Sequence, residues 1–349
     1  VHEQKRIYKE IEDELALLKI KYNYYLACQY NGEIENKDQY AMLMKSRDIS
    51  DFSSEEVQRL LIIAEEKKFF HWELEYPEVI LNGGFNIYVG NPPYVESSAE
   101  EYKNVVETKS CHNLYAYIIE NTLNNLEKSN SKIGVILPSS SVSTPRMKEF
   151  QKFLINQSSN IYISTYDDRP GKLFTRLEHM RAAIIISDIG KNKGKTYIFT
   201  TKYNRWYSDE RKNLFKNILY NQLEDYNYLD GYIPKFSYEI ENNIIKKIIK
   251  KDCCIKNYVS SMNLNNNIYY GTGVQYWIKA MDKSATEIDN TGRKSSGEKM
   301  LTIKSKYKKQ IFTSIINSSI FYWYFLSFSD CRNLTKNTIE SFPFNYENM

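Results

Sequence analysis

A short strand that ends in a stiff polar turn constrains this chain more than any other segment. Residues 85–89 (Phe-Asn-Ile-Tyr-Val) are apolar and β-rich, and Gly90 ends the run abruptly. The run predicts a buried strand that presents residues 91–94 (Asn-Pro-Pro-Tyr) at its carboxyl end. Because open α/β sheets place their ligands at that edge, we expect the functional site there.

The sequence after this turn alternates between helical and strand patterns. Helices are expected at 114–126 and 147–154, and strands at 132–137, 161–166 and 182–187. Alternation of this kind predicts an α/β fold in which this part of the chain forms half of a doubly wound sheet.

The segments on either side of this α/β region have different patterns. Residues 3–30 place apolar side chains at a helical spacing from Ile7 to Tyr25, and residues 54–68 repeat that pattern. After about residue 190 the sequence changes to short β-like runs, turn-rich links and isolated helices such as 239–250. We therefore expect a helical segment at 1–80, an α/β domain at 81–195 and a mixed α+β domain at 196–349. The core of the last domain is expected from its large aromatic residues: Trp206, Tyr276, Trp277 and the run 321–325.

Bulk properties narrow the possible partners. Residues 191–349 carry 25 Lys and Arg against 15 Asp and Glu, whereas residues 1–190 carry 22 against 28. The carboxyl half is the better candidate for contacting a polyanion, although a lysine-rich composition also arises without such a partner. The five cysteines lack CxxC spacing and the four histidines are scattered, so neither a disulfide framework nor a metal site is expected. No signal-peptide pattern or membrane-length apolar run is present, and we expect a cytoplasmic protein.

The residues of the polar turn suit one kind of chemistry. An amino group attached to an aromatic ring, such as N6 of adenine, is a poor nucleophile because its lone pair is delocalised. Two acceptors that receive both N–H protons would favour a pyramidal nitrogen whose lone pair points at an electrophile. Asn91 offers a side-chain oxygen and Pro92 a carbonyl oxygen. Pro93 stiffens the turn, and Tyr94 can stack on the ring.

Such a pocket cannot take an adenine that is stacked in a duplex, so the chemistry requires base flipping. A second aromatic ring on the other face of the base would help to offset the cost of flipping. Phe174, shortly before the strand expected at 182–187, is the candidate for that ring. A packed phenylalanine at the end of a loop explains the same residue equally well.

These residues resemble the TaqI-like class of adenine-N6 DNA methyltransferases and the fused type IIG restriction–modification enzymes. The Asn-Pro-Pro-Tyr tetrad (NPPY) is the catalytic motif of that family, and residues 70–79, 113–115 and 133–138 are also similar to family sequence. Residues 270–274, 317–324 and 332–343 resemble the carboxyl-terminal target-recognition domain of these enzymes.

The resemblance implies a partial Rossmann-like methyltransferase sheet, S-adenosylmethionine as methyl donor and double-stranded DNA as substrate. It implies catalytic roles for Asn91, Pro92, Pro93 and Tyr94, and substrate binding by Phe174, Gly271, Thr272 and Gly273.

One family feature is missing from the sequence. The resembling enzymes hold the cofactor with a glycine-bearing loop and an acidic residue, both placed before the tetrad, and residues 1–80 supply neither. The chain therefore resembles the carboxyl part of a larger enzyme. We expect little cofactor binding, no methylation by the chain alone, and association of its unpaired strand with a complementary amino-terminal chain.

Other functions remain open from the sequence. A DNA-binding recognition subunit or remnant with a vestigial methyltransferase domain would share most of these features. The tetrad also suits other planar amino groups, in RNA or in a glutamine side chain, and the choice of DNA rests on the resemblance.

Overall fold

The protein divides into two compact units. The computed structural model describes residues 2–31, 37–97, 107–174, 180–190, 194–249, 253–262, 265–285 and 297–348. One unit comprises Val1–Phe85 with Asn124–Lys128, and the other comprises Asn86–Leu123 with Ser129–Met349.

The first unit consists mainly of helices. They are α1 (His2–Asn31), α2 (Lys37–Lys45), a 3₁₀ turn at Ile49–Ser53, α3 (Glu55–Lys67), α4 (Trp72–Glu75) and α5 (Pro77–Leu81). The two helices expected here are confirmed as α1 and α3, and α3 begins after Ser54, whose hydroxyl accepts a hydrogen bond from the Val57 amide at 3.5 Å. The sequence patterns missed α2, a short helix whose Leu43 is buried in the core of this unit and whose Tyr40 and Met44 pack against that core.

The buried face of α1 is not the stripe that its apolar spacing indicates. Leu17, Tyr24 and Cys28 pack with Phe52 and Val57, and these residues form the core of the first unit. The stripe that includes Ile11, Leu15, Leu18, Tyr22 and Tyr25 stays exposed. The helical period therefore identified the helix, whereas the packing face was set by its contacts with α3 and the 3₁₀ turn.

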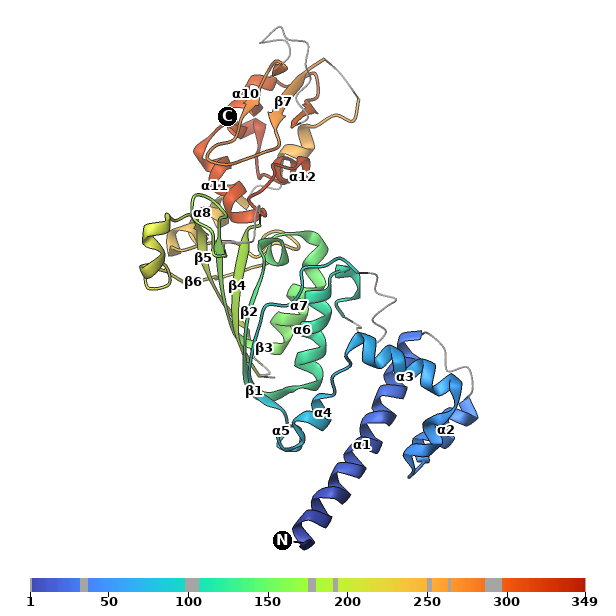
Figure 1. The fold of residues 1–349 in the computed structure, drawn as a ribbon. Coiled ribbons are helices and arrows are strands. Elements are labelled where there is room, and N and C mark those ends of the chain that lie inside the picture. The colour runs from blue at the N-terminus through green and yellow to red at the C-terminus, as the bar shows by residue number, and fades with distance from the viewer. Residues whose placement is uncertain are drawn as a thin grey trace. The chain divides into compact units, whose positions relative to one another are not determined.

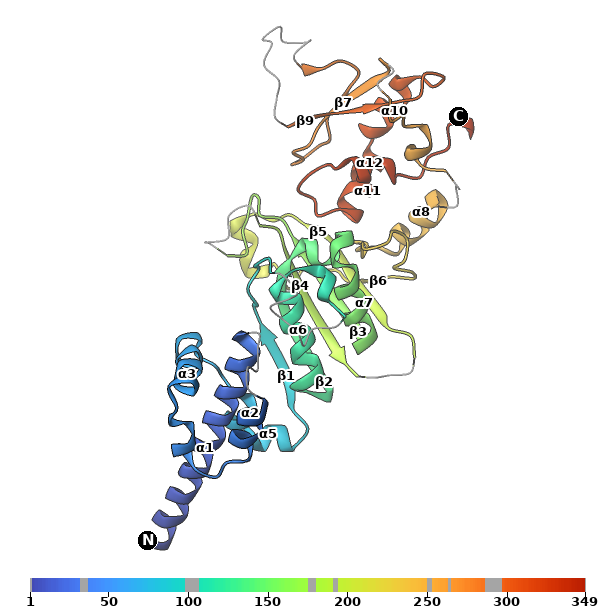
Figure 2. The same cartoon turned by 90° about the vertical axis from the view of Figure 1, so that its right-hand side faces the viewer.

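The second unit contains a mixed six-stranded sheet, which confirms the expected α/β class. Its strands are β1 (Phe85–Gly90), β2 (Glu127–Pro138), β3 (Ser158–Tyr166), β4 (Ala182–Ile189), β5 (Tyr197–Asn204) and β6 (Asn221–Gln222), in the order β1-β2-β4-β3-β5-β6. Helices α6 (Leu114–Asn125) and α7 (Lys148–Gln157) cover one face of the sheet (Figures 1 and 2). All the strands and helices expected between residues 85 and 187 are therefore confirmed.

Strand directions bring several loops to one edge of this sheet. β4 is antiparallel to both β2 and β3, and β5 is parallel to β3, so β2, β3 and β5 run in the same direction. β1 joins them, because the Phe85 amide bonds to the Leu126 carbonyl at one end and the Tyr94 side chain contacts the Ile136 carbonyl at the other. We call the edge where these four strands end the carboxyl edge.

The prediction that residues 85–89 form a buried strand is wrong in one respect. The strand exists, but it is the terminal strand of the sheet, and it exposes 64% of Ile87 and 80% of Val89. Tyr88, which points to the opposite face, packs against the core. The apolar composition of β1 therefore reflects one covered face and one open face.

The rest of the second unit is a smaller α+β region. It contains α8 (Glu239–Ile249), a three-stranded sheet of β7 (Asn267–Gly271), β8 (Ala280–Met281) and β9 (Glu298–Thr302), and helices α10 (Lys309–Ile316), α11 (Ser319–Phe328) and α12 (Lys336–Glu340). The helix expected at 239–250 is confirmed as α8. The domain limit expected near 195 stays a prediction, and β5 and β6, which follow it, pair into the six-stranded sheet.

The aromatic core expected for this region is partly wrong. Phe321, Tyr324 and Phe325 are buried and the other two members of the run 321–325 are half-buried, whereas Trp206 is buried in a cluster with Tyr166 and Ala182 of the six-stranded sheet. Tyr276 and Trp277 are 53% and 69% exposed. They occupy a bend between β7 and β8, where the chain turns and the side chains point away from the core.

No single helix in the described ranges is long and apolar enough to span a membrane. By length and composition alone, among the described helices only the bent pair of α10 and α11 together matches a span. All five cysteines are free thiols.

Candidate active site at the carboxyl edge

The predicted catalytic turn lies at the carboxyl edge, directly after β1. Asn91 is exposed, Pro92 is buried, Pro93 is exposed and Tyr94 is half-buried. The chain after the turn is fixed to the start of α6 by two backbone hydrogen bonds, from the Leu114 amide to the Val95 carbonyl at 3.0 Å and from the Ser97 amide to the His112 carbonyl at 3.2 Å. The turn therefore has a defined position between β1 and α6.

The Tyr94 hydroxyl lies between the neighbouring strand and Asn91. It donates to the Ile136 carbonyl oxygen of β2 at 2.8 Å and is in hydrogen-bond contact with Asn91 Oδ1. The Tyr94 ring meets the Tyr115 ring edge-on, with 6.3 Å between the ring centres. Burial raises the pKa of the Tyr94 hydroxyl to about 12, so it stays neutral around physiological pH and remains a hydrogen-bond donor.

The predicted stacking residue, Phe174, is exposed and lies on a loop near β2. Arg211 donates to the Lys172 carbonyl at 2.9 Å and to the Leu173 carbonyl at 2.8 Å. Leu173 is buried in a cluster against which Ile136 also packs. Phe174, which is 37% exposed, directly follows Leu173 on this loop.

A buried charge cluster follows the end of β3. Asp167 Oδ2 accepts a hydrogen bond from Arg205 Nε at 2.8 Å, and Arg181 Nε lies 3.5 Å from Asp167 Oδ1. Burial alone would raise the pKa of the Asp167 carboxyl, but the hydrogen bonds from Arg205 and Asp168 and the charge of Arg181 lower it below its usual value. The carboxylate is therefore ionised near neutral pH and holds both arginines at the carboxyl edge.

Arg205 extends this cluster to the smaller sheet. Its Nη1 donates to the Tyr322 hydroxyl at 2.9 Å, its Nη2 donates to the Gln275 carbonyl, and its guanidinium lies 5.1 Å from the centre of the Tyr276 ring. The carboxyl edge and the segment after β7 are thereby joined through one side chain. Sequence patterns gave no sign of this role, because the contacts join residues far apart in the chain and Arg205 belongs to no recognisable motif.

The predicted substrate-binding glycines lie in this segment. The Gly271 amide bonds to the Lys279 carbonyl at 3.0 Å, the Thr272 amide to the Gly297 carbonyl at 2.7 Å, and Gly273 forms a bridge with Asn333. These contacts shape the connection between β7 and β8. They do not bring the glycines into direct contact with the Asn91 turn, and the connection between the two runs through Arg205 and Asp167.

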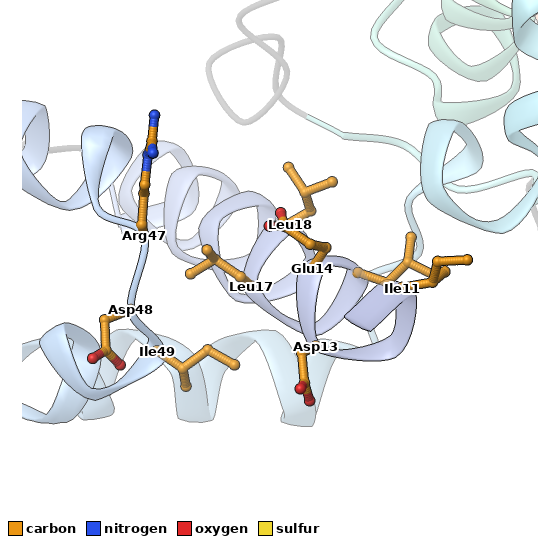
Figure 3. Close-up of a pocket in the computed structure, with 9 residues that line it drawn as sticks. Ile11, Asp13, Glu14, Leu17, Leu18, Arg47, Asp48 and Ile49 are labelled. Atoms are coloured by element: carbon orange, nitrogen blue, oxygen red, sulfur yellow. The ribbon is translucent and has the colours of Figure 1, made fainter. Parts of the chain in front are cut away.

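The regular elements described before β1 are all helices, and the strand, glycine loop and helix by which related enzymes are expected to hold S-adenosylmethionine are not among them. A groove in the first unit is lined by aliphatic and charged side chains from α1 and from Arg47, Asp48 and Ile49, and it contains none of the predicted site residues (Figure 3).

Comparisons with known proteins agree with a methylase domain. Residues 7–171 match the model of the Eco57I restriction-modification methylase family. No curated protein matches the chain.

Three solved structures show weak similarity. A DrdV–DNA complex is 15% identical (TM-score 0.34) over 44% of this chain and 19% of that chain. A nuclease-deletion mutant of the Type ISP restriction-modification enzyme LlaGI, in complex with a DNA substrate mimic, is 12% identical (TM-score 0.39) over 67% and 22%. A putative class I S-adenosylmethionine-dependent methyltransferase from Listeria monocytogenes is 16% identical (TM-score 0.26) over 32% and 34%. The matched part is thus about a third or less of each of these proteins. The chain therefore contains a region, residues 7–171, that matches the Eco57I restriction-modification methylase family and includes the Asn-Pro-Pro-Tyr turn.

Proposed function

We propose that this chain is the part of a site-specific DNA methyltransferase of a restriction–modification system that binds a flipped adenine and activates its N6 amino group. The observation that carries the proposal is the position of Asn91, which is exposed at the carboxyl edge beside a Tyr94 hydroxyl fixed on β2. The match of residues 7–171 to a restriction-modification methylase family supports the reaction class.

The Tyr94 hydroxyl provides a means of orienting the Asn91 amide. The Tyr94 hydroxyl has one proton, and the Ile136 carbonyl can only accept. The hydroxyl therefore donates to Ile136 when the Asn91 side chain presents a donor to the hydroxyl oxygen. Rotating the Asn91 amide by half a turn makes Nδ2 that donor and directs Oδ1 outward. In this arrangement Oδ1 accepts one N6 proton of adenine and the Pro92 carbonyl accepts the other, which localises the lone pair on the nitrogen.

Stacking would hold the flipped base in place. Tyr94 is bound through its hydroxyl to the Ile136 carbonyl, and the loop that carries Phe174 is anchored by Leu173 in a cluster against which Ile136 packs. Stacking of a base on an aromatic ring contributes about 1–3 kcal/mol, which is comparable with the few kcal/mol that flipping costs.

The methyl donor implied by the family is S-adenosylmethionine, and we propose that a complementary amino-terminal segment holds it. The open edge and exposed face of β1, with Ile87 and Val89, suit pairing with a strand of that segment. Pairing there would bring the donor to the strand that ends at Asn91. The chain without this segment is expected to bind DNA and not to methylate it. A cytoplasmic location is part of the same proposal.

Product analysis tests this function. The chain, coexpressed with the polypeptide encoded immediately upstream, is incubated with duplex DNA and S-adenosylmethionine carrying a labelled methyl group. We expect N6-methyladenine in the nucleoside digest, and no product from either polypeptide alone. Methylcytosine, or labelled protein or RNA in place of DNA, would contradict the proposed substrate. Salt-sensitive DNA binding without any methyl transfer would instead favour a non-catalytic recognition subunit with a vestigial methyltransferase domain.

A further inference from the structure

The segment between β7 and β8 exposes two large aromatic rings on a fixed backbone. Val274 and Ile278 are buried and anchor the segment at both ends, whereas Tyr276 and Trp277 between them are exposed. The Val274 amide bonds to the Arg332 carbonyl at 3.4 Å, and the Ala280 amide bonds to Asn317 Oδ1 at 2.8 Å. The exposed rings are thus presented on a well-anchored bend.

Arg205 fixes this bend relative to the carboxyl edge. It holds the Gln275 carbonyl and lies over the Tyr276 ring while its Nε remains bound to Asp167 at the end of β3. Asp167 in turn contacts Arg181, whose carbonyl accepts the Ser139 amide at 2.8 Å, just beyond the end of β2. A continuous series of contacts therefore connects the aromatic bend with β2, the strand to which the Tyr94 hydroxyl is bound.

Nothing in the described residues sterically requires glycine at the two positions that precede the bend. A Cβ atom added at Gly271 or at Gly273 would meet nothing within 4 Å, and neither residue has a positive φ angle. A close approach by another molecule is a remaining reason for a glycine in such a position. The open space lies only a few residues from the exposed rings.

Two exposed cations lie at the bend. Lys279 is at its carboxyl end, Arg332 is on the segment whose carbonyl accepts the Val274 amide, and residues 191–349 as a whole carry an excess of ten positive charges. Two exposed aromatic side chains with cations nearby and open space for a backbone suit nucleic acid, because aromatic rings stack on bases and cations neutralise phosphates. An apolar protein partner would not account for the cations.

We propose that Tyr276 and Trp277 form a base-stacking surface. When the adenine flips out, this surface fills the gap left in the duplex and stacks on the bases exposed there. This inference rests on the proposed function and adds to it the contact that stabilises the opened duplex. The flipped adenine itself goes to the Asn91 turn. The glycines at 271 and 273 allow the DNA backbone to approach the bend.

A binding experiment with intact and mispaired duplexes tests this role. The probe is a fluorescein-labelled duplex carrying the adenine that the methylation assay identifies, with thymine or with a mismatched cytosine opposite it. We expect Trp277→Ala to weaken binding to the paired duplex by about tenfold, the effect of one lost stacking contact. The loss should be smaller on the mismatched duplex, because opening a mispaired adenine costs less. Trp277→Phe should recover part of the affinity.

Tyr197→Ala is the matched control, because Tyr197 is also an exposed aromatic residue, 46% accessible, but it lies where β5 begins, at the opposite edge of the sheet. We expect it to change binding by less than about twofold. The proposal is overturned if Trp277→Ala binds the paired duplex as tightly as the unchanged protein, if it loses equal affinity for both duplexes, or if the loss appears only with RNA. Failure of the unchanged protein to bind duplex DNA would instead overturn the proposed function.

Discussion

At the scale of single residues, the candidate site depends on two side chains with different tasks. In the proposed reaction Asn91 supplies the acceptor for the amino group, and Tyr94 supplies both a ring and a hydroxyl that reaches β2. Neither task requires a charged group. The reaction should therefore be insensitive to pH in the range where the Tyr94 hydroxyl, with its pKa of about 12, stays protonated.

Tyr94→Phe separates the two functions of this tyrosine. The ring remains for stacking, while the contact that orients the Asn91 amide is lost. We expect kcat to fall by about three- to tenfold, as for the loss of one hydrogen bond of roughly 1 kcal/mol, with KM for DNA unchanged. Tyr94→Ala should also raise KM because stacking is lost. Equal kcat values for Tyr94→Phe and the unchanged enzyme would show that the hydroxyl has no positioning role.

Gly171 determines where the Phe174 loop lies. A Cβ atom at this position would come within 2.7 Å of the Trp206 carbonyl oxygen and 2.8 Å of its ring. We expect Gly171→Ala to lower the free energy of unfolding by about 1–3 kcal/mol in chemical denaturation, because neither backbone nor buried ring can move freely. Gly134→Ala is the control, since a Cβ atom there meets nothing within 4 Å. Similar stability for the two variants would contradict this account of the loop.

At the scale of elements, the terminal position of β1 matters most. Among the described strands β1 has a neighbour on one side only, and the exposed Ile87 and Val89 add an apolar face beside it. The strand sequence could not show this, since a run of apolar residues is compatible with a central or a terminal strand. The order of strands depends on contacts between segments distant in sequence.

Ile87→Lys tests whether this face is a pairing surface. Because the side chain is exposed, we expect the free energy of unfolding of the isolated chain to change by less than about 0.5 kcal/mol. Copurification with the complementary segment, and methyl transfer by the pair, should be strongly reduced. Met300→Lys is the control, because the Met300 side chain is exposed in β9 of the smaller sheet. It should leave copurification unaffected. Undiminished association of Ile87→Lys would exclude this face as the interface.

At the scale of the whole molecule, Arg205 connects the six-stranded sheet to the smaller α+β region. Its three polar partners, Asp167, Gln275 and Tyr322, come from separate parts of the second unit. The partly buried guanidinium can satisfy all three at once because its donors point in fixed, divergent directions. A lysine ammonium could not reach them together.

Arg205→Lys should therefore loosen the connection between the two regions. We expect the free energy of unfolding to fall by about 2 kcal/mol, from lost hydrogen bonds to a charged group, measured by chemical denaturation. Binding to duplex DNA should weaken as well, because the aromatic bend loses its attachment. Arg146→Lys, which alters an exposed pair with Glu96, should change stability by less than about 1 kcal/mol. Equal effects of the two substitutions would argue against a connecting role for Arg205.

The sequence predicted the individual helices and strands better than it predicted their positions relative to one another. The strands at β1 to β4 were found because each is a β-rich apolar run between turn residues, and the polar turn after β1 was located for the same reason. The open edge of β1, the role of Arg205 and the exposure of Trp277 were not found. Each depends on contacts between distant parts of the chain; Arg205 and Tyr322, for example, are 117 positions apart. The catalytic and substrate-binding roles of the predicted site residues stay predictions.

The most direct test of the central claim compares Asn91→Ala with the unchanged chain, each assembled with its complementary segment. Methyl transfer to N6 of adenine is measured in single turnover at DNA concentrations that saturate both enzymes. Because Asn91 is exposed and acts on the amino group alone, we predict DNA affinity within about twofold and transfer at least about a hundredfold slower, as for a lost preorganised group at a reacting centre. Transfer by Asn91→Ala at the unchanged rate would contradict the account.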